Sequence, residues 1–193
     1  MANHCYNWIS FHGEKESLDK LATALETYKN FTSFNDWVDS MIEYTPPKDD
    51  KRVYYHYGTK WFDFEVDDNG DENMLVRGDS AWSPPLEMTR SLCEHFEVGA
   101  RHEYEESGCD FGGYWVIQDN GYVSEEFETS YNHWRYMEDS YSYMDNLIND
   151  LEDESYGSIE ELLKDNKFLS NADSVLIIDE WNNYESNKIN SAE

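Results

Sequence analysis

The sequence predicts an α+β protein: a ferredoxin-like split βαβ sandwich with an added β-hairpin, followed by an acidic, mainly helical extension. The hydrophobic periodicity alternates as strand, helix, two strands, helix and further strands, which is the split βαβ order. Two Asn-Gly pairs, Asn69-Gly70 and Asn120-Gly121, are typical of hairpin turns. Composition then shifts, because residues 124–193 hold 18 acidic and 4 basic residues. We expect a ferredoxin-like domain over residues 1–123 and an acidic helical extension, packed on it, over residues 124–193.

The first strand and helix follow from residues 5–31. The run "CYNWISFHG" is aromatic and β-branched and ends at Gly13, as strands commonly do. After Ser17, which can cap a helix, the apolar residues recur at helical spacing. These residues are Leu18, Leu21, Ala22, Leu25 and Tyr28. A weaker helical pattern over residues 34–44 ends before Pro46-Pro47.

A hairpin and a second helix come next. Residues 51–66 predict a strand in which Phe62, Phe64 and Val66 point inward. The pair Asn69-Gly70 predicts a two-residue type I′ turn before a returning strand over residues 72–82. A helix then follows, with Ser83 as its N-cap and Pro84 at its first position. Strands over residues 100–106 and 114–118, and a last strand over residues 122–127, complete the domain.

The extension predicts helices. An apolar stripe runs from Tyr136 to Leu151, and Ser158 with Glu161 forms a capping box before a further helix. The run Val175 to Ile178 is either a buried strand or the end of a packed helix.

Three segments, "YGTKWFDF", "DSAWSPPLEM" and "YEESGCDFGGYW", together with the opening "NHCYNWISFHG", resemble the YubB ferredoxin-like family of plasmid and phage proteins. The matching residues are Gly58 to Trp61, Ala81 to Pro85, Gly108 to Phe111, and Gly113. The resemblance covers about residues 1–123 and implies a ferredoxin-like fold. It implies little about activity, and it does not extend to the acidic residues that follow.

Charge is the outlying property of the chain. The net charge is −28, whereas about 2–8 charges of either sign are enough to keep a small domain soluble. An aromatic content of 16% indicates a folded protein and not a disordered acidic tail. The charge argues against direct binding to nucleic acid or anionic membranes. It favours either a halophilic type of solvation or a cationic partner.

The three cysteines, Cys5, Cys93 and Cys109, have no CxxC spacing, which indicates a reducing compartment. The first residues lack the pattern of a signal peptide, and no apolar run is long enough to cross a membrane. We therefore expect a cytoplasmic protein, acting in the cytoplasm of a host cell.

Metal binding is disfavoured by spacing. A calcium loop counted from Asp67 would place Gly70 at its fourth position and Gly78 at its twelfth, where the loop requires an acid. The group Cys93, His95, His102 and Cys109 matches no zinc-finger spacing, and Cys93 lies on an apolar stripe. We expect no metal and no cofactor.

Catalysis is also disfavoured. Gly108, Gly112 and Gly113 match no phosphate-binding loop, and no nucleophile has a recognisable motif. With 42 acidic residues some carboxylates will lie close together, but the 14 basic residues leave few cations to stabilise a transition state. We predict that the protein is not an enzyme. An enzyme with a carboxylate-bound divalent metal remains the third alternative.

The leading hypothesis rests on the excess of acidic residues. Carboxylates repeated along helices can imitate the charge of DNA, and interspersed aromatic residues can anchor a protein interface. We therefore predict a phage- or plasmid-encoded inhibitor that blocks a basic nucleic-acid-binding host defence enzyme or complex by DNA mimicry. The alternative is a non-catalytic assembly module with a solvated acidic surface. Formation of a homodimer is a further open alternative. The predicted acidic display comprises Asp139, Asp145, Asp150, Glu152, Asp153, Glu154, Glu160 and Glu161. The predicted aromatic anchors are Tyr131, Trp134, Tyr141 and Tyr143.

Overall fold

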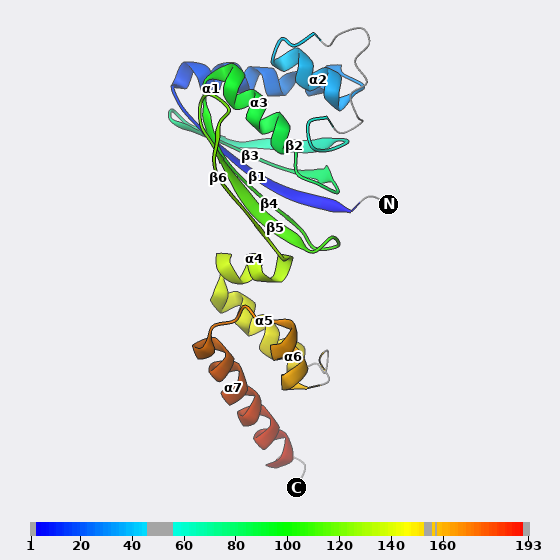
Figure 1. Cartoon of the computed structure of the whole chain (residues 1–193), viewed down its shortest axis with the longest axis vertical. Coiled ribbons are helices and arrows are strands. Elements are labelled where there is room, and N and C mark those ends of the chain that lie inside the picture. Colours follow the sequence, from blue (N-terminus) through cyan, green and yellow to red (C-terminus); the bar gives the residue numbers. More distant parts are fainter. Residues whose placement is uncertain (1–2, 46–55, 153–155, 157, 191–193) are drawn as a thin grey trace. The chain divides into compact units, whose positions relative to one another are not determined.

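The chain folds into two compact units, Met1–Thr129 (unit 1) and Ser130–Glu193 (unit 2). The computed structural model describes residues 3–45, 56–152, 156 and 158–190. Figure 1 shows the elements of both units. The boundary expected at residue 123 falls at the start of the last strand of unit 1, and the compact units divide after Thr129 because that strand completes the sheet. Packing of the extension on the domain stays a prediction.

Unit 1 is a six-stranded antiparallel sheet with helices on one face. The sheet order is β2-β3-β1-β4-β5-β6. The strands are β1 (His4–His12), β2 (Phe62–Asn69), β3 (Asn73–Ala81), β4 (Gly99–Glu106), β5 (Phe111–Ile117) and β6 (Val123–Thr129). The helices are α1 (Lys15–Leu25), η1 (Glu26–Asn30), α2 (Phe34–Met41) and α3 (Leu86–Phe96). The first four strands and the helices α1 and α3 form the split βαβ sandwich, and β5-β6 is the added hairpin, so the predicted fold class is confirmed.

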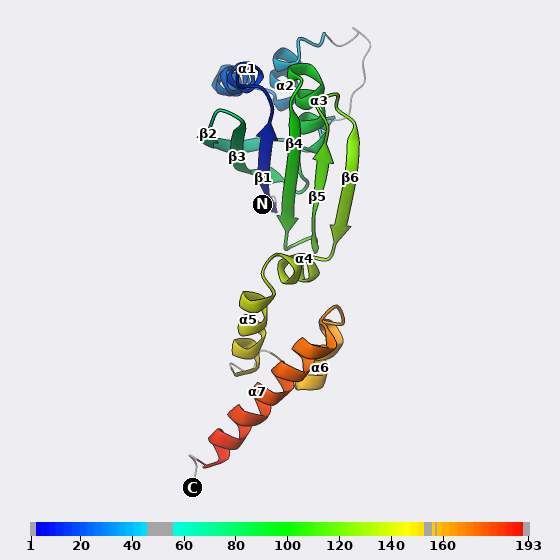
Figure 2. The ribbon, with the colours of Figure 1, turned by 90° about the vertical axis from the view of Figure 1, so that its left-hand side faces the viewer.

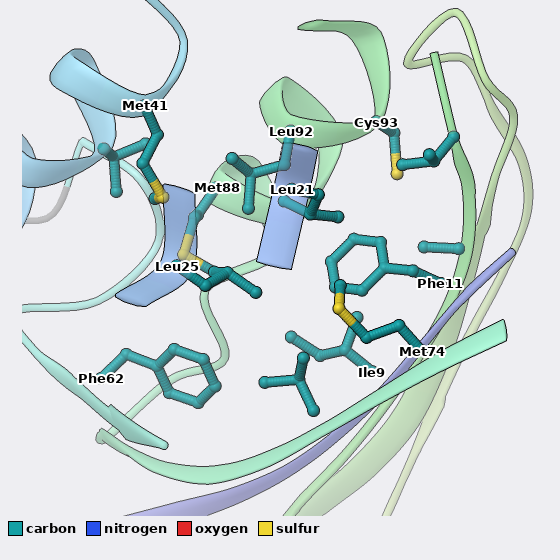
Figure 3. Close-up of a cluster of buried hydrophobic side chains, with 14 of the residues drawn as sticks. Ile9, Phe11, Leu21, Leu25, Met41, Phe62, Met74, Met88, Leu92 and Cys93 are labelled. Atoms are coloured by element: carbon teal, nitrogen blue, oxygen red, sulfur yellow. The ribbon is translucent and has the colours of Figure 1, made fainter. Parts of the chain in front are cut away.

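Alternation along the strands builds the core of unit 1. In β1, Asn7, Ile9 and Phe11 are buried, whereas the side chains between them are more exposed. Figure 3 shows Ile9 and Phe11 packed beneath Leu21 and Leu92, which come from α1 and α3. In Figure 1 these helices and α2 lie together on one side of the sheet. The opposite face of the sheet therefore keeps its side chains outside this core.

Several local predictions for unit 1 were wrong. Helix α1 begins at Lys15 after Glu14, so Ser17 lies inside the first turn and does not cap it. Helix α3 begins at Leu86 with Pro85 at its N-cap position, so Ser83 and Pro84 lie before the helix, and the Ser83 hydroxyl donates to the carbonyl of Gly58 at 2.5 Å. The β2-β3 connection is the three residues 70–72 and not a two-residue turn at Asn69-Gly70.

The other strand predictions held in part. Of the strand predicted over residues 51–66, only the part from Phe62 onward is strand, and residues 51–55 lie outside the described residues. Phe62 is fully buried, but Val66 is 38% exposed. The second hairpin is confirmed: Gly121 takes a positive φ of 74° and donates its N–H to the carbonyl of Gln118 at 2.9 Å.

Unit 2 consists of helices around its own small core. They are α4 (Tyr131–Glu138), α5 (Ser140–Glu152), α6 (Ile159–Asp165) and α7 (Asn171–Asn190). The buried residues are Leu147, Leu151, Leu162, Leu169 and Ile177. The run Val175 to Ile178, left open between strand and helix, lies in the first half of α7. Ser158 accepts the N–H of Glu161 at 3.2 Å, which confirms the predicted cap of α6. In the view of Figure 2, α7 is the longest helix of this unit.

No helix in the described part of the chain combines the length and the apolar character needed to cross a membrane.

Candidate functional site

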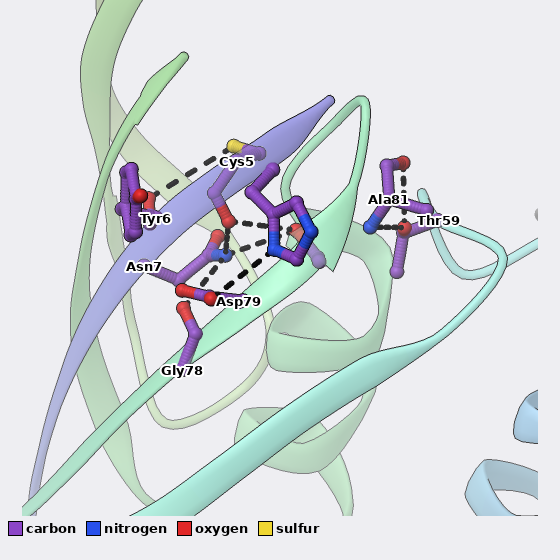
Figure 4. Close-up of polar contacts among 9 residues, drawn as sticks. Cys5, Tyr6, Asn7, Thr59, Gly78, Asp79 and Ala81 are labelled. Atoms are coloured by element: carbon purple, nitrogen blue, oxygen red, sulfur yellow. Dashed lines mark hydrogen bonds and ion pairs between the residues drawn. The ribbon is translucent and has the colours of Figure 1, made fainter. Parts of the chain in front are cut away.

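The two segments "GTKW" and "AWSPP" meet at one corner of unit 1. Thr59 donates to the carbonyl of Ala81 at 2.9 Å and accepts the N–H of the same residue at 3.0 Å, as Figure 4 shows. Gly58 has a φ of 101°, and a Cβ there would lie 2.6 Å from the carbonyl oxygen of Pro84. Only glycine fits such a position without strain. These segments therefore join the loop before β2 to the start of α3, which is a structural task.

The segment "GCDF" closes the turn between β4 and β5. The carboxylate of Glu106 accepts the backbone N–H groups of Gly108 (3.0 Å) and Cys109. Cys109 is exposed, and its hydrogen bond with Glu106 raises the pKa of its thiol. A thiol that stays protonated is a poor nucleophile. Cys109 is therefore not an activated cysteine.

A polar network lies buried between β1, β4 and α3. His102 is fully buried and contacts Asn7 Oδ1 through Nε2 at 3.0 Å and the Thr89 hydroxyl through Nδ1 at 2.8 Å. Asn7 in turn donates to the carbonyl of Cys5 at 2.7 Å and to the Ser80 hydroxyl at 2.9 Å (Figure 4). Burial lowers the pKa of His102 to about 3, so the imidazole is neutral at ordinary pH. Both ring nitrogens are used inside the fold, which identifies His102 as a structural residue.

The residues weighed as zinc ligands do not converge. Cys93 lies in the core of unit 1, where burial raises the pKa of its thiol to about 12. His102 belongs to the buried network, and Cys109 lies on the β4-β5 turn. Among the described residues, no three His, Cys, Asp or Glu side chains are grouped so that they could hold a metal ion.

The predicted acidic display lies on the helices of unit 2. Asp145 and Asp150 are exposed on α5, and Glu160 and Glu161 are exposed in the first turn of α6, where the helix dipole favours carboxylates. Asp139 is also exposed, but its carboxylate accepts the N–H of Ser142 at 3.0 Å at the start of α5. The side chain of Glu152, like Asp153 and Glu154, lies outside the described residues.

Further acidic residues of unit 2 were not singled out from the sequence. Asp165, Asp179 and Glu180 are exposed on α6 and α7. Placing the run Val175 to Ile178 on a helix would have put Asp179 on the side away from the buried Ile177, but the sequence gives no such signal for Asp165 or Glu180. Arg135 lies 3.6 Å from Glu138, and Lys164 and Lys167 are the other bases with described side chains in this unit. The outward surface of unit 2 is therefore strongly negative.

The predicted aromatic anchors are largely used within the fold. Trp134 is only 3% exposed, so its indole is not on the surface. Tyr143 packs on the core of unit 2 and donates its hydroxyl to Asn166 Oδ1 at 2.6 Å. Tyr131 is half-buried, and the side chain of Tyr141 lies outside the described residues. Among the side chains of unit 2 that the structure describes, the exposed large apolar ones are instead Met137, Val175 and Leu176, which are 52–55% exposed.

Comparison with known proteins supports the fold but does not indicate a function. Residues 60–145 match a family model described as the ferredoxin-like domain in Api92-like protein. The chain thus carries a ferredoxin-like family match from β2 into α5. No curated protein and no solved structure matched the chain. The second half of α5, α6 and α7 lie beyond the match.

Proposed function

We propose that the protein is a non-catalytic inhibitor that occupies the basic nucleic-acid-binding surface of a host defence enzyme or complex by DNA mimicry. The observation that carries the proposal is the negative outward surface of unit 2 in a chain of net charge −28. The carboxylates stand on helices that are held by a common core, so their spacing is set before a partner arrives. Preorganised charge steers association and gives a strong salt dependence.

The first domain supports a mobile-element origin for this function. Its segments resemble the YubB family of plasmid and phage proteins, and an inhibitor of host defence is a function that such elements require. His102 is held neutral in a buried network and Cys109 keeps its proton, so neither side chain is an activated catalytic group. Binding, and not catalysis, is then the function that the described side chains serve best.

The acidic surface can be tested by neutralising it without altering its shape. The variant carries five substitutions on unit 2: Asp145→Asn, Asp150→Asn, Glu160→Gln, Asp179→Asn and Glu180→Gln. A matched control removes five exposed carboxylates of unit 1: Glu26→Gln, Asp71→Asn, Glu72→Gln, Glu94→Gln and Asp119→Asn. Both proteins lose the same charge, so they separate a defined surface from charge in general.

Each protein is immobilised and exposed to a lysate of a bacterial host, and retained proteins are identified by mass spectrometry. We expect the wild type and the unit 1 control to retain the same nucleic-acid-binding protein, and the unit 2 variant to lose it. Retention should fall as salt rises, because surface ion pairs are screened within about 10 Å at 0.1 M salt. Equal retention of the partner by both variants, or retention that does not change with salt concentration, would refute the proposal.

A second candidate is an assembly module that joins copies of the chain or a neighbouring protein. The exposed Val175 and Leu176 on α7, at 55% and 54%, favour it, because adjacent apolar side chains on an acidic helix suit a protein contact. A salt-resistant oligomer measured by light scattering, lost in Val175→Ser with Leu176→Ser, would support this candidate over mimicry.

A further inference from the structure

The sheet of unit 1 has a face that its helices do not cover. Residues of β1 whose side chains point away from the core include Tyr6 and Trp8, which alternate with the buried Asn7 and Ile9. Tyr6 is 48% exposed. The strand register places Asp79 beside Tyr6, and Arg77 beside Trp8, on the same face. Because α1, α2 and α3 pack on the other face, the helices of unit 1 leave this one uncovered.

A hollow of about 370 Å³ lies in this face across β2, β3 and β1. Its volume falls within the range of roughly 300–1,000 Å³ that is usual for ligand sites. Asn7, Phe64 and Gly78 contribute the floor, since their side chains, where present, point to the core. The side chains around it are Tyr6, Trp8, Asp63, Glu65, Arg77 and Asp79.

Acidic side chains outnumber basic ones around the hollow. Asp63 lies directly opposite Asp79 in the antiparallel pair of β2 and β3, and His4 Nδ1 lies 3.2 Å from one carboxylate oxygen of Asp79. Like charges in such positions repel and cost stability. Arg77 is directed to Asp67, at 3.2 Å, where a bulge in β2 adds one residue. The hollow therefore has more carboxylates than cations, although it borders two aromatic rings.

A neighbouring part of the same face already binds a guanidinium. Arg101 lies 3.9 Å above the centre of the Tyr114 ring and 2.7 Å from the carboxylate of Glu103. The register of β4 with β5 and of β4 with β1 places Glu103 beside Tyr114 and Trp8. Aromatic ring and carboxylate together form a good environment for arginine, which stacks on the ring and bonds the carboxylate.

We propose that the hollow binds an arginine side chain from a basic segment of a protein partner. Tyr6 or Trp8 stacks on the guanidinium, while Asp63 and Asp79 accept its N–H groups. Charge complementarity selects this occupant, since the bound cation relieves the repulsion between the two carboxylates. The site belongs to unit 1 and does not depend on the acidic display of unit 2, so it adds a second point of contact with a basic partner.

The test uses the full chain labelled with ¹⁵N and the probe N-acetyl-arginine amide, at about 150 mM salt to suppress weak surface binding. We expect saturable shifts of the backbone amides of Tyr6, Trp8 and Gly78. The neutral isostere N-acetyl-citrulline amide should leave these signals in place, and N-acetyl-lysine amide should bind more weakly.

Variants make the assignment specific. Asp63→Asn with Asp79→Asn should weaken the binding of the arginine probe by at least about tenfold. The control Asp71→Asn with Glu72→Gln, on the exposed connection between the same two strands, should bind as the wild type does. The amide spectrum of each variant also reports whether it is folded.

Shifts spread evenly over the acidic surfaces without saturation would overturn the proposal. So would equal shifts from the citrulline or lysine probe, or equal loss in the two variants. The unit 2 variant proposed above should bind the probe normally, and this result separates the failure of the hollow from the failure of the mimic.

Discussion

Asp63 and Asp79 lie directly opposite each other across β2 and β3, on the face of the sheet that the helices leave open. Register forces the two carboxylates together, because Phe62 and Phe64, on either side of Asp63, must point to the core. A sheet gains nothing from such a pair. Its presence beside Tyr6 and Trp8 suits a surface that meets a cation.

Removing one member of this pair should stabilise the protein. We expect Asp63→Asn to raise the free energy of unfolding by roughly 0.5 kcal/mol at low salt, because it ends the repulsion with Asp79. Urea denaturation measures this, and the gain should shrink as salt is added. The control Asp19→Asn removes a carboxylate that lies 2.7 Å from Lys15 and should give no gain. A loss of stability in Asp63→Asn would show that the pair is not repulsive.

His102 should make stability depend on pH. Burial lowers its pKa to about 3 from an ordinary value of 6.5. As pH falls below 6.5, His102 becomes protonated in the unfolded chain but stays neutral in the folded chain. The contribution of His102 to the free energy of unfolding is therefore complete above pH 6.5 and is lost towards pH 3. The loss is at most about 1.4 kcal/mol per pH unit for one proton.

The measurement compares the wild type with His102→Gln between pH 7 and pH 4. We expect the stability advantage of the wild type to decrease over this range, whereas the titration of the many carboxylates cancels in the difference. Proton NMR supplies an independent check, since the ring signals of His102 should not shift above about pH 4. A transition of those signals near pH 6.5 would contradict the buried neutral imidazole.

The end of α3 should gain from glycine. Glu97 caps this helix with φ of 55° and ψ of 47°, a left-handed conformation in which side chains are disfavoured, and donates its N–H to the carbonyl of Cys93. We expect Glu97→Gly to raise the melting temperature and to add about 0.5–1 kcal/mol of stability. Glu97→Gln keeps the strain and removes only the charge, so it should not reproduce the gain. Equal stabilisation by both variants would assign the effect to charge.

The cap of α6 should be needed for the shape of unit 2. Ser158 accepts the N–H of Glu161, and Leu162 on the same helix is fully buried in the unit 2 core. Ser158→Ala should lower the free energy of unfolding by about 1 kcal/mol, whereas Ser158→Thr, which keeps an acceptor, should cost less. Circular dichroism with urea measures both. No difference between Ala and Thr would mean that the cap contributes nothing.

Much of the fold could be predicted because alternation and helical spacing are local signals. The stripe from Leu18 to Leu25 and the two Asn-Gly pairs place α1 and the hairpins with no knowledge of the fold. The helix start at Leu86 could not be found in this way. Ser83 is a good cap by itself, but in the fold it lies before the helix and donates its hydroxyl to Gly58, which is far away in sequence and near only in the fold.

The candidate surfaces show the same limit. The exposure of acidic side chains in unit 2 follows from its composition, so the exposed positions of Asp145 and Glu160 could be predicted. Trp134 could not be recognised as buried, because helical spacing does not say what covers a residue. The hollow beside Tyr6 depends on the register of three strands, two of which come from distant segments. Outward positions can be read from alternation in β1, but their neighbours cannot.

The central claim is that the acidic surface of unit 2 excludes nucleic acid from a basic partner. The most direct measurement is competition: the partner retained by the wild type is loaded with a fluorescent DNA or RNA duplex, and the protein is added while anisotropy is followed. We predict that the wild type and the unit 1 control displace the duplex, less so as salt rises, and that the unit 2 variant does not. A complex in which partner, duplex and protein are bound together, with no loss of anisotropy, would contradict the claim.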